Sequence, residues 1–317
     1  MVTEIRERPV REVNIDALPS QAGAPIRSLV PLKPTGTTRP LFIVHGMFGD
    51  IFHFKRLAER IRDDIPLYGL QARGLWGDVP PHRSIPDAAA AYIEEIRTIQ
   101  PGGPYLLGGF SFGGMIAWEM AHQLAGAGDE LDLFLFDIGP DTLFRRRRRR
   151  EQQLSLWRRV THPFRVATFH ARNAWGLEPH RRRAYLRRVY RGEMGKLGRR
   201  LGLGRENALY RASLRTGRRL PPGHMAIREA SRVAREEWQW EPYDGPVTLL
   251  RARIQQPNDN AGPTLGLTPG LALGDIQVRH VGGHHEYIFL EPHVYRVAAE
   301  VEAWIDRVTA ARSAPHP

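Results

Sequence analysis

The chain has 317 residues, of which 42% are hydrophobic and 25% are charged, so it can bury one large core as a soluble globular protein does. It contains no cysteine, which excludes disulfides, thiolate metal sites and a cysteine nucleophile. The N-terminus lacks the apolar stretch of a signal peptide, and no run of about 18 uncharged apolar residues indicates a transmembrane helix. We therefore expect a cytoplasmic protein with no membrane span.

The net charge of +12 is concentrated in one segment of the chain. Residues 141–223 contain 23 Arg and one Lys against five acidic residues, a balance of +19, so the rest of the chain sums to −7. The segment includes the six consecutive arginines of residues 145–150. Three explanations are open: a solvated helix surface, a docking site for an acidic partner protein, or a contact with nucleic acid or membrane. Of these, we do not expect a nucleic-acid partner.

Apolar runs and turn residues predict alternating strands and helices in the first half of the chain. The expected strands are residues 40–46, 65–71, 104–110 and 131–139, and the expected helices are residues 51–64, 84–100 and 113–128. The second of these helices opens on Ser84 with Asp87 three residues later, which resembles a capping box. Strands alternating with helices indicate an α/β fold with a mostly parallel central sheet flanked by helices.

The second half of the chain divides into an insertion and a return to the sheet. Residues 142–240 lack strand signals and contain Arg-rich helical stretches, so we expect a helical lid insertion. Strand character returns at residues 246–253 and 275–281, and an amphipathic helix is expected over residues 291–310. The predicted organisation is a flexible leader (1–38), a core in two pieces (39–141 and 241–312), and the lid between them.

Ser111 is the candidate nucleophile. It is the centre of a G-x-S-x-G sequence, Gly109 to Gly113, that follows an expected strand and opens an expected helix. Small flanking residues let the strand and helix approach, while the sharp turn exposes the serine hydroxyl. The Phe112 N–H would then point from the helix N-terminus at an oxyanion. A glycine-rich turn with no chemical role is the competing interpretation.

A serine nucleophile needs a base, and two consecutive histidines are placed to supply one. His284 and His285 follow the last expected strand, at the sheet edge where catalytic groups of open α/β sheets gather. We assign His284 as the base and keep His285 as a spectator or alternative base. Gly282 and Gly283 would allow the tight turn that projects a side chain toward the site. His45 is expected to be structural.

The third catalytic group must orient the imidazole and stabilise its charged form. Asp137 ends a buried strand and has the right topology for this role. Asp141 lies four residues later, and Asp259 follows the strand 246–253, where many serine hydrolases of this architecture place the acid. The residues alone leave the choice between them open.

Six segments, taken together, resemble the thioesterase domains of nonribosomal peptide and polyketide synthases. They are "PLFIVHGMFGDIFHFKRLAERI", "IPLYGLQARGLWG", "GPYLLGGFSFGGMIAWEMA", "LFLFD", "GPVTLLRAR" and "GGHHEYIFLEPHV", in this order and with suitable spacing. The resemblance covers residues 27–306 and is weakest across the lid. It implies an α/β-hydrolase fold with Ser111 as nucleophile, Asp137 as acid and His284 as base. It also implies an oxyanion hole formed by the backbone N–H groups of Met47 and Phe112.

The chain departs from the family pattern in three places. The loop "HGMFGD" lacks the two adjacent glycines of many members, which bears on the assignment of Met47. Leu267 stands where the family often has Trp. The Arg-rich lid is not a shared feature, so no role transfers to it.

The resemblance implies release of an acyl, polyketide or peptidyl chain from a phosphopantetheinyl carrier protein, by hydrolysis or cyclisation. No cofactor or metal of the enzyme's own is expected. No carrier-like "DSL" motif is present, so we expect a free-standing enzyme that acts on a separate acidic carrier. The basic residues 142–220 are the candidate docking site for that carrier. An esterase or lipase of the same fold, and a non-catalytic anion-binding protein that uses the basic lid, are the alternatives.

Overall fold

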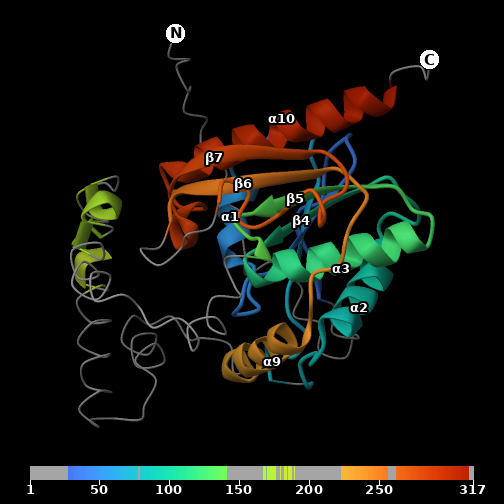
Figure 1. Ribbon diagram of the computed structural model, residues 1–317, viewed down its shortest axis with the longest axis horizontal. Helices are drawn as coiled ribbons and strands as arrows, with labels where there is room; N and C mark the ends of the chain where they lie inside the picture. Colours follow the sequence, from blue (N-terminus) through green and yellow to red (C-terminus); the bar gives the residue numbers. More distant parts are fainter. Residues whose placement is uncertain are drawn as a thin grey trace.

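A computed structural model describes residues 28–77, 79–140, 167–168, 170–175, 179, 182–183, 185–187, 189, 223–255 and 262–313. The core of this part of the chain is a seven-stranded sheet (Figure 1). Its strands are β1 (Leu29–Lys33), β2 (Leu41–Val44), β3 (Leu67–Leu70), β4 (Tyr105–Phe110), β5 (Leu131–Phe136), β6 (Val247–Ile254) and β7 (Ile276–His284). The strands β2 to β7 match the runs that the sequence predicts.

The strands lie in the order β1-β3-β2-β4-β5-β6-β7, and every neighbouring pair except β1 and β3 is parallel. The residues of β2, β3, β4 and β5 are buried throughout, as expected for parallel strands covered on both faces. The carboxyl ends of parallel strands meet at one edge of the sheet. The turns after β4, β5 and β7 are therefore brought together there.

Helices cover both faces of the sheet (Figure 1). One face carries α2 (Ile85–Arg97) and α3 (Phe112–Gly126), and the other carries α1 (Phe52–Ala58) and α10 (His293–Ser313). Each layer buries its own apolar cluster, with Tyr92 and Trp118 on the first face and Phe54 and Trp304 on the second. The expected mostly parallel α/β sheet is thus confirmed.

The helix boundaries follow from local sequence in one case and differ in another. The Ser84 hydroxyl accepts a hydrogen bond from the Asp87 N–H at 3.1 Å, so α2 begins where the capping pattern predicts. The expected helix over residues 51–64 is shorter in the structure, because α1 ends at Ala58 and a turn follows at residues 59–60. Just beyond that end, the Lys33 side chain of β1 donates hydrogen bonds to the carbonyls of Ile61 and Arg62.

The expected leader over residues 1–38 extends too far, because residues 29–33 form β1. This strand pairs antiparallel with β3, and the Glu95 carboxylate accepts hydrogen bonds from the N–H groups of Ser28 and Leu29. β1 is a five-residue edge strand that contains Pro31, so it carries too little alternation to stand out in the sequence. Its position is set by pairing with β3 and by α2.

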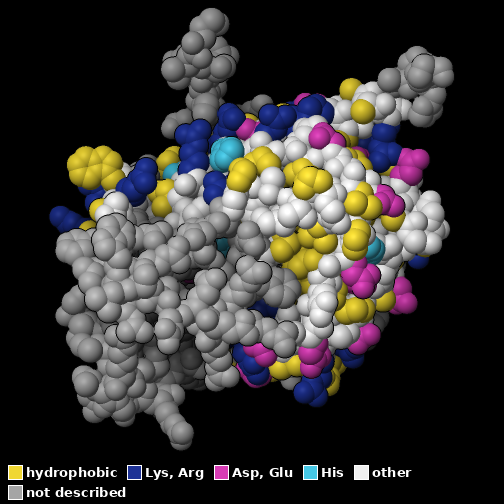
Figure 2. Space-filling view, viewed as in Figure 1, with side chains coloured by type: hydrophobic (Ala, Val, Ile, Leu, Met, Phe, Trp, Pro, Cys, Tyr) yellow, Lys and Arg dark blue, Asp and Glu magenta, His cyan; other side chains and the backbone are white. Residues whose placement is uncertain are grey.

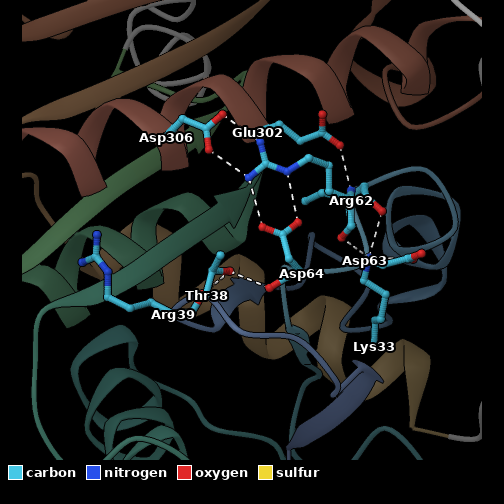
Figure 3. A network of polar contacts seen from close by, with 9 residues as sticks. Lys33, Thr38, Arg39, Arg62, Asp63, Asp64, Glu302 and Asp306 are labelled. Carbon is cyan, nitrogen blue, oxygen red and sulfur yellow. Dashed lines mark hydrogen bonds and ion pairs between the residues drawn. The ribbon is translucent and has the colours of Figure 1, made fainter.

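A polar network ties the loops next to β1 and α1 to the long helix α10 (Figure 3). The Arg62 guanidinium donates to both Asp306 carboxylate oxygens at 2.8 Å and to Asp64, while the Arg62 N–H donates to Glu302 at 2.7 Å. The Asp64 carbonyl accepts from the Thr38 N–H and hydroxyl, both at 2.9 Å. These contacts join segments that are far apart in the chain and hold α10 against the α1 layer.

The predicted insertion, residues 142–240, contains the helix α9 (His224–Glu237). The arginine run 145–150 lies outside the described residues, so the predicted basic lid stays a prediction. In the view of Figure 2, Lys and Arg side chains of the described part gather along the edge formed by β7 and α10; Arg279, Arg296 and Arg307 belong to these elements. No helix in the described part of the chain is long and apolar enough to cross a membrane.

Candidate active site

Ser111 lies between β4 and α3 in a strained backbone conformation. Its φ is 56° and its ψ is −124°, a region that residues with a side chain rarely adopt. The Ser111 N–H lies 3.4 Å from the Phe136 carbonyl of β5, which places the turn at the carboxyl end of the sheet. This is the strand-turn-helix context that a serine nucleophile of this motif requires.

The flanking glycines are needed because the backbone atoms around the turn are in close contact. A Cβ atom at Gly113 would lie 2.0 Å from the His45 carbonyl oxygen, and one at Gly109 would lie 2.5 Å from the Gly113 carbonyl oxygen. Both distances are far below van der Waals contact, and the neighbours are backbone atoms that cannot rotate away. The two glycines therefore set how closely α3 approaches β2 and β4.

Asp137 follows β5 directly, is 3% exposed and has a φ of 53°. Its Oδ1 accepts hydrogen bonds from the Ala252 N–H at 2.7 Å and from the Gln255 side chain at 3.1 Å. Its Oδ2 lies 3.0 Å from Nδ1 of His285. Burial raises the pKa of Asp137, but the hydrogen bond and charge of His285 and the two other donors outweigh it, so the pKa is lowered. Asp137 is therefore ionised at neutral pH.

The structure brings His285, and not His284, to Asp137. The two strands β6 and β7 pair regularly up to Ala252 and Val281, and the next pair is Ile254 with His284. Strand β7 thus contains one residue more than β6 across this interval, a bulge that changes which side chains face the site. Gly283 has a φ of 76° within this bulge, a conformation that glycine adopts without strain, and the residues expected to form a tight turn lie inside β7 instead.

The environment of His285 suits a base. Burial lowers its pKa, but the hydrogen bond and charge of Asp137 outweigh burial and raise the pKa above the ordinary histidine value. The side chain is 27% exposed, so the ring remains accessible. Because Nδ1 faces Asp137, the other ring nitrogen, Nε2, is left for a reaction partner.

His284, the sequence-based choice, occupies a packing position. It is 6% exposed, its Nδ1 accepts the Glu286 N–H at 3.3 Å, and its ring packs edge-on against Tyr287 with centroids 4.5 Å apart. Tyr185, which lies in the predicted insertion, contributes to the same small apolar cluster as Tyr287. The geometry therefore favours His285, which the sequence analysis kept as the alternative. The competing acids Asp141 and Asp259 lie outside the described residues.

The two residues expected to form the oxyanion hole lie at the start of α3 and in the turn after β2. Phe112 is the first residue of α3, where a backbone N–H has no acceptor within the helix. Met47 lies in the turn after β2, two residues beyond His45, whose carbonyl oxygen is close to Gly113. His45, expected to be structural, is 2% exposed, and burial lowers its pKa to about 4. Its Nδ1 lies 2.6 Å from the Gly46 carbonyl oxygen and its Nε2 lies 3.0 Å from the Tyr92 hydroxyl. These contacts connect the loop after β2 to helix α2.

Helix α9 supports the same loop from the other side, which the sequence analysis missed. The His224 ring stacks on Phe48 with centroids 4.8 Å apart, and its Nε2 lies 4.0 Å from Asp50. A Cβ atom at Gly49 would lie 2.9 Å from the Ile227 side chain. The C-terminal end of α9 is tied to α3 by Trp238, whose indole donates to Glu119 at 2.9 Å. No local signal predicts these contacts, because they join segments distant in the chain.

Two further residues at the site had no predicted role. Gln255 is the side-chain donor to Asp137, and Phe110, which precedes the serine, stacks on His285. Leu267, the departure from the family's Trp, is 1% exposed in the core cluster that covers α3. In the described part of the chain, no three His, Asp or Glu side chains are grouped as a metal ion requires.

Comparison with known proteins finds similarity to one family over part of the chain. The family model for the thioesterase domain matches residues 39–179. The predicted resemblance to thioesterase domains is confirmed. Among curated relatives, the dimodular nonribosomal peptide synthase of Bacillus subtilis is 43% identical over 107 residues, which are 34% of this chain and 4% of the relative. Nonribosomal peptide synthetase btyA of Aspergillus terreus is 41% identical over 107 residues, 33% of this chain and 12% of the relative.

Solved structures extend the comparison over most of the chain. The NocB thioesterase domain, in covalent complex with a fluorophosphonate nocardicin G analogue, aligns with a TM-score of 0.58 at 23% identity and covers 87% of this chain and 98% of NocB. The RedJ thioesterase of the Streptomyces coelicolor prodiginine pathway aligns with a TM-score of 0.52 at 20% identity, covering 84% and 90%. The fold is thus the α/β-hydrolase fold of these thioesterases. The chain spans only 4% and 12% of the two curated relatives described above.

Proposed function

We propose that the chain is a serine thioesterase that releases an acyl, polyketide or peptidyl chain from the phosphopantetheine arm of a carrier protein in secondary metabolism. The observation that carries the proposal is the His285–Asp137 pair at the sheet edge where Ser111 occupies its strained turn. The matching family and the thioesterase folds of NocB and RedJ support the thioester as the bond attacked. Ser111, His285 and Asp137 are the proposed catalytic residues, with Met47 and Phe112 as oxyanion donors.

The proposed reaction begins with proton transfer from the Ser111 hydroxyl to Nε2 of His285. The serine oxygen attacks the thioester carbon, and the N–H groups of Met47 and Phe112 stabilise the resulting oxyanion. Cleavage of the carbon–sulfur bond returns the proton from Nε2 to the departing thiolate and leaves an acyl ester on Ser111. Water, or a hydroxyl or amine of the acyl chain, then attacks the ester while His285 takes its proton and returns it to the Ser111 oxygen.

Asp137 contributes orientation and charge to this sequence. Its carboxylate holds Nδ1–H of His285, so that the second nitrogen is the one presented for proton transfer, and it stabilises the imidazolium that forms. The Ala252 and Gln255 donors keep the carboxylate ionised and fixed in its buried position.

The proposal is tested by thiol release from an acyl-pantetheine thioester. Because the chain has no cysteine, a thiol reagent reports only the released pantetheine and has no background from the enzyme. We expect thiol release, and labelling of Ser111 by a fluorophosphonate probe, in the wild type but not in Ser111→Ala. Thiol release that survives in folded Ser111→Ala would overturn the proposal. Equal turnover of the matching oxygen ester would favour the esterase alternative.

Docking of an acidic carrier on the basic residues 142–220 is a second part of the proposal. It is supported by the balance of +19 over residues 141–223. We expect the KM for an acyl-carrier protein to rise several-fold between about 0.05 and 0.5 M salt, while the KM for free acyl-pantetheine changes little. Equal salt dependence of both substrates would contradict carrier docking and leave the catalytic proposal intact.

A further inference from the structure

Phe110 is the aromatic residue that directly precedes the nucleophile in the G-x-S-x-G motif. Its ring stacks on the His285 imidazole, with centroids 4.8 Å apart and ring planes inclined by 23°. The side chain is 6% exposed, so this contact is shielded from water. One face of the proposed base is therefore covered by the residue next to the proposed nucleophile.

The Phe110 ring is itself held in place from other directions. Phe289 packs edge-on against it with centroids 5.2 Å apart and an interplanar angle of 89°. Phe289 in turn contacts Phe54 and Phe136, each at 5.3 Å, which belong to the core of the α1 and α10 layer. A Cβ atom at Gly46 would lie 3.2 Å from the Phe110 ring, so the loop after β2 also lies against this ring. The ring cannot move without disturbing these neighbours.

A single hydrogen bond to Asp137 leaves the imidazole of His285 free to pivot about that bond. A ring stacked on its face removes this freedom. An aromatic face also attracts a positive charge, and the imidazole becomes positive when it accepts the serine proton. The other groups that act on His285 are Asp137, the adjacent Glu286, and Gln255 through the shared carboxylate. His53 lies on Phe110 as well, with centroids 5.8 Å apart.

We propose that Phe110 is a positioning residue that holds the His285 imidazole in the plane that serves Ser111 and stabilises the imidazolium formed during attack. The inference rests on the proposed function, because it takes His285 as the base. It assigns a chemical role to Phe110, the position before the serine in G-x-S-x-G, at which the motif specifies no residue type. A ring that only fills the core is the competing explanation.

Phe134 offers a matched control for the competing explanation. It is 0% exposed, belongs to the same apolar cluster as Phe110, and contacts Phe136 and Trp304. The Phe110→Leu and Phe134→Leu substitutions remove the same atoms from the same core. Only the first removes the ring from the histidine.

The experiment measures kcat, KM and the pH profile of thioester cleavage for Phe110→Leu, Phe110→Tyr and Phe134→Leu. In Phe110→Leu we expect kcat to fall about tenfold at unchanged KM, and the acid limb of the profile to move down by about 0.5 pH unit, because the imidazolium loses its aromatic neighbour. Phe110→Tyr keeps the ring and is expected to retain kcat and the profile. Phe134→Leu is expected to lower only the Tm.

Matching kinetics and profiles in Phe110→Leu and Phe134→Leu would overturn the proposal, as would a loss in Phe110→Tyr equal to that in Phe110→Leu. If Phe110→Leu does not fold, Phe110→Met replaces it with a side chain of closer volume and the same comparison applies. Ser111→Ala and Asp137→Asn are measured alongside. If these two retain activity, the proposed function fails, whatever the Phe110 variants show.

Discussion

The turn around the proposed nucleophile Ser111 (the nucleophile turn) and the proposed acid–base pair of Asp137 and His285 depend on contacts of different range. Around Ser111, Gly113 lies against the backbone of Val44 and His45, and Gly109 lies against the first turn of α3. The pair of Asp137 and His285 joins residues 148 positions apart, across β5, β6 and the bulge in β7. The first region is specified by local residue types, whereas the second depends on strand register. We therefore expect substitutions at the pair to change chemistry, and substitutions of the glycines at the turn to change folding.

The largest expected effect separates the two adjacent histidines. His285→Ala removes the proposed base, so we expect the rate constant of thioester cleavage to fall about 10⁴-fold or more. His284→Ala removes a buried ring that packs on Tyr287, so we expect a lower Tm but a rate within about tenfold of the wild type. Thiol release and thermal unfolding are measured on both variants. The reverse pattern in folded proteins would restore His284 as the base.

Asp137→Asn is expected to reduce kcat/KM about 10²- to 10⁴-fold and to move the pH profile. The base must be neutral to act, so activity rises as pH increases through the pKa of His285. Asp137 raises that pKa against the effect of burial, and without the carboxylate the acid limb moves to lower pH. Asp259→Asn is the matched control. An acid limb that moves only in Asp259→Asn would identify Asp259 as the acid.

The Asp137–His285 pair is also expected to make the stability of the fold depend on pH. Because the His285 pKa is raised in the folded protein, its contribution to stability is full below the ordinary histidine value and is lost as pH rises through the raised pKa. The Asp137 pKa is lowered, so its contribution is present above the ordinary carboxyl value and is lost as pH falls through the lowered pKa. We expect Asp137→Asn to destabilise the fold most between these limits, as urea unfolding against pH would show. A uniform loss at all pH values would contradict the pairing.

Gly113→Ala tests the nucleophile turn. The new methyl group would lie 2.0 Å from the His45 oxygen and 2.6 Å from the Val44 oxygen, so α3 and β2 must separate. We expect a loss of about 3 kcal/mol or more in the free energy of unfolding. Gly126→Ala is the control in the same helix, where a Cβ atom meets nothing within 4 Å and a change of under about 1 kcal/mol is expected. Equal urea midpoints for the two variants would contradict the close-packing argument.

A smaller effect is expected from the bulge in β7. Gly283→Ala places a side chain at a φ of 76° and 2.6 Å from the His293 ring, so we expect a loss of about 1–2 kcal/mol in stability and about tenfold in kcat. Gly128→Ala has the same backbone strain, with a φ of 83°, but open space around it. It should lose stability without losing activity. Parallel activity losses in both variants would show that the bulge does not position His285.

The smallest expected effect is that of Gln255→Ala. Asp137 would lose one donor at 3.1 Å but keep those of Ala252 and His285, so we expect kcat/KM to fall about two- to fivefold. Steady-state kinetics against Gln277→Ala, a glutamine on β7 that contacts Asp275, give the matched comparison. A loss as large as that of Asp137→Asn would mean that Gln255 holds the carboxylate almost alone.

The elements that the sequence predicts well are those with strong local signals. The buried strands β2 to β5 appear as short apolar runs, and α2 begins at its Ser84 cap as the pattern indicates. The edge strand β1 lies within the residues predicted as a leader, because five residues with a proline in the middle acquire their structure only by pairing with β3. The contacts of α9 with Phe48 and Gly49 in the loop after β2 have no local signal at all.

Local residue types are enough to place the serine turn, the central buried strands and the acid that follows β5, because glycine conformations and apolar runs act over a few residues. Which of the two adjacent histidines meets that acid depends instead on contacts between segments distant in the chain. One extra residue in β7 changes the side chains that face the sheet edge, and a strand's register is set by its partner β6 and not by its own residues. The choice of Phe110 as the ring beside His285 follows from the same pairing.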